Sequence, residues 1–167
     1  TATEIRARAT AIDGNGTDTD WVVIDSFPLL NAYSGSLILD TGWYLLETRS
    51  YSGATELAGT SLNQIGVGDI FITTGQSNAA NFGQSAQSAD DTRVSYYSLA
   101  DGWKHADDLP SNPSAHAGTL GSPWPELGDL LTAASDVPVA FVSIADGGSE
   151  VNSWTPAVAD NYPNLKN

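Results

Sequence analysis

The chain of 167 residues has no cysteine, no methionine and only six basic side chains. Without cysteine it can form neither a disulfide nor a thiolate metal site, and cysteine usage leaves the redox compartment open. The 20 acidic residues bring the formal charge to −14. A field of that sign repels phosphate backbones and anionic lipid, which argues against nucleic acid and membrane surfaces as partners, whereas sugars are compatible with it. The basic residues form no patch or stripe along the sequence: Arg6, Arg8, Arg49, Arg93, Lys104 and Lys166.

Long apolar runs are also missing. The longest stretch, around residues 137–145, is far short of the ~20 residues that a membrane helix needs. The chain starts at Thr1 without a charged-then-apolar leader, so we expect a processed or excerpted piece of a protein. Hydrophobic residues make up 41% and charged residues 16%, which is typical of an ordered globular protein. The length allows one ordinary domain, or two small ones of which at least one is incomplete.

Residues 1–66 show short β-rich runs separated by turn signals and no helical period, which predicts a small β-sandwich domain. Turn residues such as Asp-Gly-Asn-Gly at 13–16 and Ser-Gly at 52–53 stand between the runs. The expected strands are residues 4–12, 21–24, 36–39, 43–51 and 56–65.

The pattern changes in residues 67–167. Residues 69–74 form an apolar, β-branched run, as in a parallel strand covered on both faces. A helix is expected from Ser122 to Asp136, and a second apolar strand at 139–145. Strand, helix and strand predict a βαβ unit with parallel pairing, so the turns after both strands lie at the same edge of the sheet. The polar stretch 84–121 is too long for an ordinary connection and is expected to contain local structure.

Ser77 and the Gly147-Gly148 pair follow these two strands, where ligands sit in open parallel sheets. A serine at a tight glycine turn that opens a short helix exposes its hydroxyl beside backbone N–H groups, and such groups can stabilise an oxyanion. The residues alone leave an alternative open for each turn. Ser77 or Asn78 can merely cap the next helix, and the glycine pair can merely end a strand.

Residues 68–78, Gly-Asp-Ile-Phe-Ile-Thr-Thr-Gly-Gln-Ser-Asn, resemble the first conserved block of the SGNH hydrolases. The similar branch is that of the sialate O-acetylesterases and related carbohydrate acetyl esterases. Residues 121–129 also resemble this branch, as do residues 137–141 leading into Gly147-Gly148-Ser149 and Trp154. The similar blocks run in order over roughly residues 66–160. More weakly, residues 41–49 are similar to a strand of the β-domain that precedes the catalytic domain in some members.

The resemblance implies a three-layer α/β fold around a parallel sheet, of which residues 67–167 would be the N-terminal half. It also implies a secreted or cell-surface serine esterase that acts on acetylated carbohydrate and needs no metal or other cofactor. Ser77 would be the nucleophile, and its own N–H and that of Gly148 would donate to the oxyanion, or that of Gly147 if the register slips by one. The remaining residues would shape the site or line the acyl or sugar pocket: Gln76, Asn78 and Trp154.

The chain departs from the family in two ways. Ser149 stands where the family usually has threonine, which keeps the hydroxyl. The third block, a strand end with Gly-Glu, and the late Asp-x-x-His that supplies the general base are not found before Asn167. A serine hydroxyl is a weak nucleophile without a base, so we expect the base and its carboxylate in the remaining C-terminal part of the same domain. His105 and His116 lie in the long loop region and are interpreted as solvated loop side chains.

Two other interpretations remain open. The chain can be a non-catalytic glycan-binding or structural module of an extracellular appendage or virion that kept the fold. Alternatively, the rest of the domain can be a separate fragment packed onto this one. The acidic run from Asp13 has Asp18 and Ile24 where a calcium loop needs glycine at its sixth and glutamate at its twelfth position, so it is interpreted as a hairpin turn. No clustered His or Cys indicates a transition metal.

Overall fold

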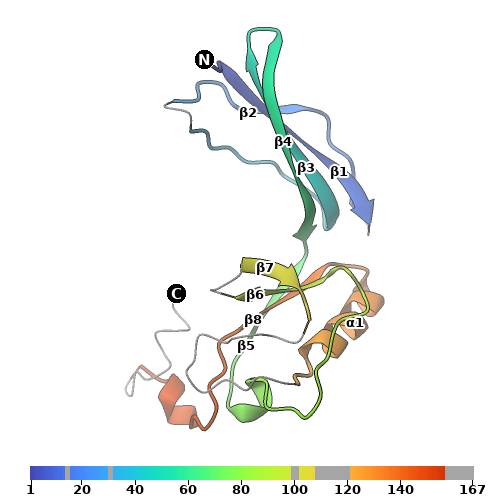
Figure 1. The fold of residues 1–167 in the computed structure, drawn as a ribbon, viewed down its shortest axis with the longest axis vertical. Coiled ribbons are helices and arrows are strands. Elements are labelled where there is room, and N and C mark those ends of the chain that lie inside the picture. Colours follow the sequence, from blue (N-terminus) through green and yellow to red (C-terminus); the bar gives the residue numbers. More distant parts are fainter. Residues whose placement is uncertain (14–15, 30–31, 99–101, 108–120, 157–167) are drawn as a thin grey trace. The chain divides into compact units, whose positions relative to one another are not determined.

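The structure of the chain is a computed structural model that describes residues 1–13, 16–29, 32–98, 102–107 and 121–156. The chain divides into two compact units, Thr1–Gly68 and Asp69–Asn167 (Figure 1). Within the described residues, no helix has the length and apolar character required to cross a membrane.

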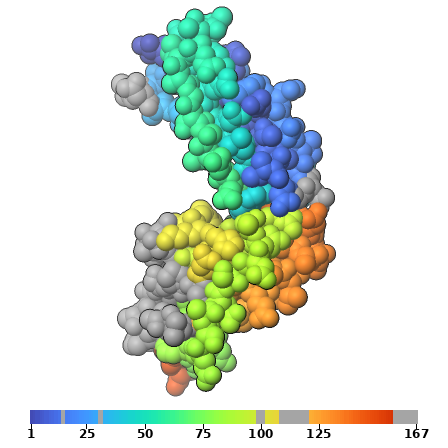
Figure 2. Space-filling view, turned by 45° about the vertical axis from the view of Figure 1, so that its right-hand side comes forward, coloured from blue at the N-terminus to red at the C-terminus, as the bar shows by residue number. Residues whose placement is uncertain are grey.

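The first unit contains one antiparallel sheet of four strands in the order β2-β1-β3-β4. The strands are β1 (Glu4–Asp13), β2 (Val22–Asp25), β3 (Gly42–Ser52) and β4 (Thr55–Val67). Four of the five expected strands are therefore confirmed. β4 is exposed along nearly its whole length, and its atoms, teal to green, form a continuous strip on the surface in Figure 2.

One face of this sheet is apolar and forms the core of the unit. Ile5, Ala7 and Ala9 alternate along β1 and are at most 4% exposed. Tyr44 of β3 is fully buried on the same face, and its hydroxyl donates to the Asp40 carbonyl at 2.8 Å. The alternation along β1 therefore places its small apolar side chains inward, as the period of a half-buried strand predicts.

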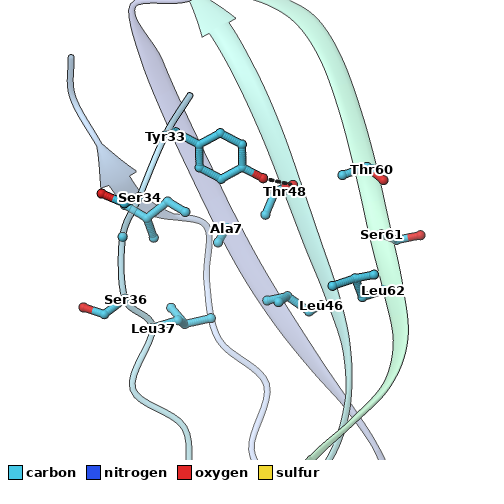
Figure 3. Close-up of a pocket in the computed structure, with 12 residues that line it drawn as sticks. Ala7, Tyr33, Ser34, Ser36, Leu37, Leu46, Thr48, Thr60, Ser61 and Leu62 are labelled. Carbon is cyan, nitrogen blue, oxygen red and sulfur yellow. Dashed lines mark hydrogen bonds between the residues drawn. The ribbon is translucent and has the colours of Figure 1, made fainter. Parts of the chain in front are cut away.

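The expected strand at residues 36–39 is wrong, because this segment has no strand structure. Instead, residues 33–37 run across the apolar face, where Tyr33 points toward Thr48 (Figure 3). The two hydroxyl oxygens are 3.4 Å apart. The strands described in this unit thus form a single sheet, and the second sheet of the expected sandwich is not among them. The apolar pattern of 36–39 reflects packing of a loop on the sheet, since Leu37 lines this face and Ile38 is 93% exposed.

The opposite face of the sheet is charged, which corrects the expectation that the basic residues form no patch. Arg6 on β1 lies directly opposite Arg49 on β3, and Arg8 opposite Glu47. Half of the six basic residues of the chain therefore share this face. The pairing register of β1 and β3 creates this patch. The sequence does not indicate that register, because Arg49 lies 41 positions or more after the two arginines of β1.

The second unit contains a mixed, mostly parallel sheet in the order β5-β8-β6-β7. The strands are β5 (Asp69–Thr73), β6 (Val94–Ser98), β7 (Gly102–His105) and β8 (Val139–Ser143); the helices are η1 (Ser77–Ala79), α1 (Trp124–Ser135) and η2 (Val151–Trp154). The predicted parallel pairing is confirmed, with Asp69 opposite Val139 and Thr73 opposite Ser143. The connection 84–121 contains β6 and the antiparallel β7, while its residues 99–101 and 108–120 lie outside the described part.

Helix α1 covers one face of this sheet. Phe141 of β8 is 1% exposed, and its ring centroid lies 5.9 Å from that of Phe71 and 5.9 Å from that of Trp124. Gly128 lets the helix approach closely, because an added Cβ would lie 2.3 Å from Cγ1 of Val94. The unit is therefore a small α/β arrangement whose core fixes β8 against the helix.

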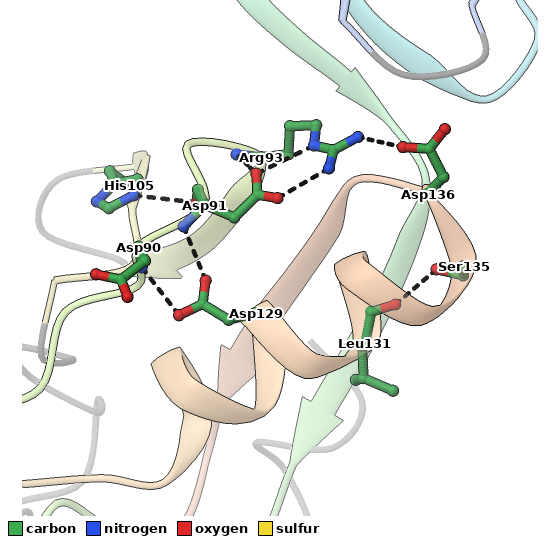
Figure 4. A network of polar contacts seen from close by, with 8 residues as sticks. All are labelled: Asp90, Asp91, Arg93, His105, Asp129, Leu131, Ser135 and Asp136. Carbon is green, nitrogen blue, oxygen red and sulfur yellow. Dashed lines mark hydrogen bonds and ion pairs between the residues drawn. The ribbon is translucent and has the colours of Figure 1, made fainter.

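A polar network ties the start of β6 to α1 (Figure 4). The Asp129 carboxylate on α1 accepts the backbone N–H groups of Asp90 and Asp91, each at 2.9 Å. The Arg93 guanidinium bridges the Asp91 carboxylate, at 2.8 Å, and the Asp136 carboxylate beyond the helix, at 2.6 Å. These contacts hold the segment before β6 in place.

The hydrogen bonds to two carboxylates of this unit lead us to expect that the protein loses stability in acid. The hydrogen bond from Arg93 lowers the pKa of the Asp91 carboxyl, and the hydrogen bond from Ser88 lowers that of Asp107. A carboxyl with a lowered folded-state pKa stabilises the fold above its ordinary value of 3.8 and loses this contribution as pH falls through the folded value. We therefore expect the free energy of unfolding, measured in urea, to be flat above about pH 5 and to fall below about pH 4.

Asp91→Asn tests whether the Asp91–Arg93 pair contributes to this stability, and a substitution of the neighbouring Asp90 serves for comparison. At pH 7 we expect it to lower the free energy of unfolding by about 1 kcal/mol, a modest value because the pair is partly exposed to solvent. It should also flatten the loss below pH 4. Asp90→Asn is the matched control, because its side chain is exposed and makes no hydrogen bond with a described residue. Equal costs for the two variants would contradict the role of the Asp91–Arg93 pair.

Candidate functional site

The turns after β5 and β8 lie side by side. The pairing of the two strands continues past their ends, because the Ile144 N–H donates to the Thr73 carbonyl at 2.9 Å and the Asp146 N–H to the Gly75 carbonyl at 2.8 Å. The expectation that both glycine turns meet at one edge of the sheet is thus confirmed.

The first turn places Ser77 at the start of a short 3-10 helix. Gly75 has φ +141°, a conformation that favours glycine, and Gln76 is extended with φ −95° and ψ −151°. Gln76 occupies the N-cap position, and no side chain caps the helix. The capping alternative for Ser77 and Asn78 is therefore wrong. Ser77 is half-buried, and its hydroxyl donates to Asn78 Oδ1 at 3.5 Å, a long hydrogen bond.

The second turn is tied to the first by Ser149. Gly148 has φ +78°, which requires the conformational freedom of glycine. The Ser149 hydroxyl donates to the Gly75 carbonyl at 3.4 Å and accepts the Trp154 indole N–H at 3.2 Å. Sequence reasoning treated this residue as a conservative replacement and missed its bridging role. The signal was the hydroxyl kept at a position where the similar family has threonine.

A hollow of about 400 Å³ lies between the two turns. Gln76 and Trp154 line it, together with backbone of Gly75 and the side chains that follow Gly148. The residues that line it come from both turns: Thr74, Gly75, Gln76, Ser149, Glu150, Val151 and Trp154. Of the predicted site residues, Gln76 and Trp154 line the hollow. The others stand in the adjoining turns and do not line it: Ser77, Asn78, Gly147 and Gly148.

Two backbone donors at this edge have no acceptor in the part of the chain that the structure describes. Among the described residues, no hydrogen bond engages the N–H of Ser77 or the N–H of Gly148. Ser77 is half-buried and Gly148 exposed. Free N–H groups near a serine hydroxyl are the chemical requirement for stabilising an oxyanion.

His105 does not serve Ser77. It lies on β7 opposite Ser95, which in turn pairs with Ala140 near the amino end of β8, whereas Ser77 follows the carboxyl end of β5. Both ring nitrogens are occupied, Nδ1 by the Asp107 carboxylate at 2.9 Å and Nε2 by a backbone carbonyl at 3.3 Å. The interpretation of His105 as a solvated loop side chain is therefore wrong, because it is a strand residue whose two ring nitrogens both have partners. His116 lies outside the described residues.

A second serine near His105 also lacks the geometry of a catalytic triad. Ser88 donates to Asp107 Oδ1 at 2.5 Å, and His105 contacts the same oxygen. The carboxylate thus lies between serine and histidine, whereas catalysis requires the histidine between the other two.

In the described ranges, no three His, Asp or Glu side chains gather to hold a metal ion. Asp18 of the acidic turn accepts the Ala11 N–H at 2.7 Å, as a hairpin turn residue does.

No protein-family model matches the chain, and neither does any curated protein. Among solved structures, a protein of Arabidopsis thaliana is 18% identical with a TM-score of 0.44, over 57% of this chain and 47% of that chain. A carbohydrate acetylesterase from Xanthomonas citri is 18% identical with a TM-score of 0.42, over 95% of this chain and 38% of that chain. The chain therefore spans less than half the length of each of these structures.

Proposed function

We propose that the chain is part of a carbohydrate O-acetyl esterase in which Ser77 is the acyl-accepting nucleophile. The observation that carries the proposal is the hydrogen-bonded pairing of the Gly75–Ser77 and Gly147–Ser149 turns at the carboxyl ends of two parallel strands. Acyl transfer needs a nucleophile and oxyanion donors within one small volume. Turns joined at this edge are suited to that arrangement.

In this proposal each predicted residue has a part. The Ser77 hydroxyl attacks the ester carbonyl, and the N–H groups of Ser77 and Gly148 stabilise the tetrahedral oxyanion, with Gly147 as the alternative donor. Gln76 and Asn78 shape the turn on either side of the nucleophile. Trp154, anchored through its indole N–H to Ser149, lines the hollow that receives the acyl group or the sugar. The reaction uses no metal or other cofactor, and an acetylated glycan as substrate accords with a secreted or cell-surface enzyme.

The general base and its carboxylate come, in this proposal, from a further part of the same domain that packs beside β5. Among the strands that the structure describes, β5 stands at the end of the sheet order and pairs with β8. Ile70 and Ile72 are each 60% exposed on it, and Phe71 is 40% exposed. Proteins normally cover such an apolar edge. Additional strands and helices here would complete a three-layer α/β fold and bring a histidine to the Ser77 end of the sheet.

Alanine substitutions of two exposed side chains test whether further chain covers β5. They are made in the protein that carries the remaining domain. Ile72 is 60% exposed and Leu130, on the outer face of α1, is 65% exposed. If further chain covers β5, Ile72→Ala should lower the free energy of unfolding by about 2–4 kcal/mol. Leu130→Ala should cost less than about 1 kcal/mol, since α1 remains an outer helix. Urea titrations give both values, and equal small costs would refute a domain that packs on β5.

The alternative function is a non-catalytic glycan-binding or structural module of an extracellular appendage or virion. The observation that favours it is that no histidine contacts Ser77 within the described residues. Ester hydrolysis separates the two functions. An esterase loses activity when Ser77 is replaced, whereas a module has no activity to lose.

A further inference from the structure

The charged face of the first unit carries an ordered stack of arginine and aromatic side chains. The guanidinium carbon of Arg8 lies 4.9 Å from the centroid of the Trp21 ring, and that of Arg49 lies 4.6 Å from it. Arg6 lies over the Tyr51 ring at 4.5 Å. Stacked guanidinium groups hold an aromatic ring in one orientation.

Acidic side chains neutralise these arginines. Glu47 pairs with both Arg8 and Arg49, the latter at 3.7 Å, and Arg49 also pairs with Glu56 at 2.9 Å. Arg6 pairs with Glu4. The face therefore offers many fixed hydrogen-bonding groups without an excess of positive charge, so it does not form an anion site.

The segment that carries Trp21 is itself fastened to β1. The Thr19 N–H donates to the Ala9 carbonyl at 2.9 Å, and the Thr19 hydroxyl accepts the Ala9 N–H at 3.0 Å. Trp21 is half-buried. The segment before Trp21 is thus fixed to β1 and its ring is stacked with guanidinium groups, while part of its surface stays open.

That open part borders a hollow of about 340 Å³. Polar groups surround the indole there, from β1 and from the segment that precedes β2: Arg8, Thr10, Asp18, Thr19 and Asp20. The Asp20 carboxylate has no hydrogen bond or ion pair with a described residue. A volume of this size is typical of a small-molecule site.

We propose that this hollow binds a neutral sugar unit of a glycan. The C–H face of a pyranose ring stacks on the indole, while carboxylates, hydroxyls and guanidinium N–H groups exchange hydrogen bonds with its hydroxyl groups. Asp18 and Asp20 give the hollow a negative balance that disfavours phosphate and other anions. Its polar lining disfavours a purely apolar ligand, because buried polar groups need partners.

This site lies wholly within the first unit and is independent of the proposed esterase. It would hold the protein on a glycan whether or not Ser77 is active. Ser77→Ala therefore leaves glycan binding unchanged, so failure of the esterase proposal and failure of this one give different results.

Native gel electrophoresis with a soluble polysaccharide in the gel tests the site in the whole chain. The probes are xylan, glucomannan and hydroxyethyl cellulose, with polygalacturonate as an anionic control. We expect at least one neutral polysaccharide to retard the protein and polygalacturonate not to. Trp21→Ala should weaken the association at least about tenfold. Trp103→Ala is the matched control, because Trp103 is a 55% exposed tryptophan on β7 of the other unit and should leave retardation unchanged.

Asp20→Asn keeps the test decisive if Trp21→Ala does not fold. Asp20 is exposed and makes no hydrogen bond or ion pair with a described residue, so its replacement should leave the Tm unchanged and still reduce retardation. Retardation should also persist in about 0.5 M NaCl, because the ligand is neutral. At this salt concentration, interactions between exposed charges are screened within a few Å. The proposal is overturned if no neutral polysaccharide retards the wild-type protein. It also fails if salt abolishes the retardation, or if folded Trp21→Ala and Asp20→Asn both bind like wild type.

Discussion

Hydrolysis of p-nitrophenyl acetate is expected to fall at least about a thousandfold when Ser77 is replaced by alanine in the protein that carries the complete domain. The alanine removes the oxygen that forms the acyl-enzyme bond, and oxyanion donors alone retain only a small part of the catalysis. Ser77 stands at the first position of η1, so the substitution removes no side-chain cap and should leave stability nearly unchanged. Initial rates at saturating ester, with urea unfolding alongside, separate lost chemistry from lost folding.

Ser61→Ala is the control for this experiment. Ser61 is an exposed serine on β4 of the first unit, and its replacement should not change the rate. Activity that survives in Ser77→Ala would rule out Ser77 as the nucleophile. A wild-type protein with no esterase activity, although it contains the remaining domain, would instead favour the non-catalytic module.

Replacing Phe141 by alanine is expected to lower the free energy of unfolding of the second unit by about 3–5 kcal/mol. The ring is 1% exposed and packs between Phe71 and Trp124, so its removal loses buried area and leaves a cavity between sheet and helix. The helix is anchored by this core, and β8 leads directly into the Gly147–Ser149 turn. The same variant should therefore also loosen the site edge.

The matched control for Phe141 is Phe82→Ala in the same unit. Phe82 is 54% exposed, so its replacement should cost less than about 1 kcal/mol. Urea titrations followed by tryptophan fluorescence give both values. A cost for Phe141→Ala as small as that for Phe82→Ala would show that β8 is not held by this core.

Several elements followed from local sequence signals. Short β-rich runs separated by turn residues predicted the strands of the first unit, and the continuous apolar runs of β5 and β8 predicted parallel strands. The Ser122-Pro123 start predicted α1 to within two residues. Such signals are legible because side-chain periodicity and turn conformation depend on neighbouring residues only. The run at 36–39 misled for the same reason, since an apolar pattern does not reveal whether backbone partners exist.

The placement of Ser77 in a turn after a parallel strand was determined by the sequence itself, through the β-branched run and the glycine that ends it. Only the tertiary structure decided what lies beside that turn. Strand order and register brought Ser149 to the Gly75 carbonyl, set Arg6 opposite Arg49, and put His105 at the far end of the sheet from Ser77. These neighbours are distant in the chain, so their contacts depend on how whole strands pair and not on any local pattern.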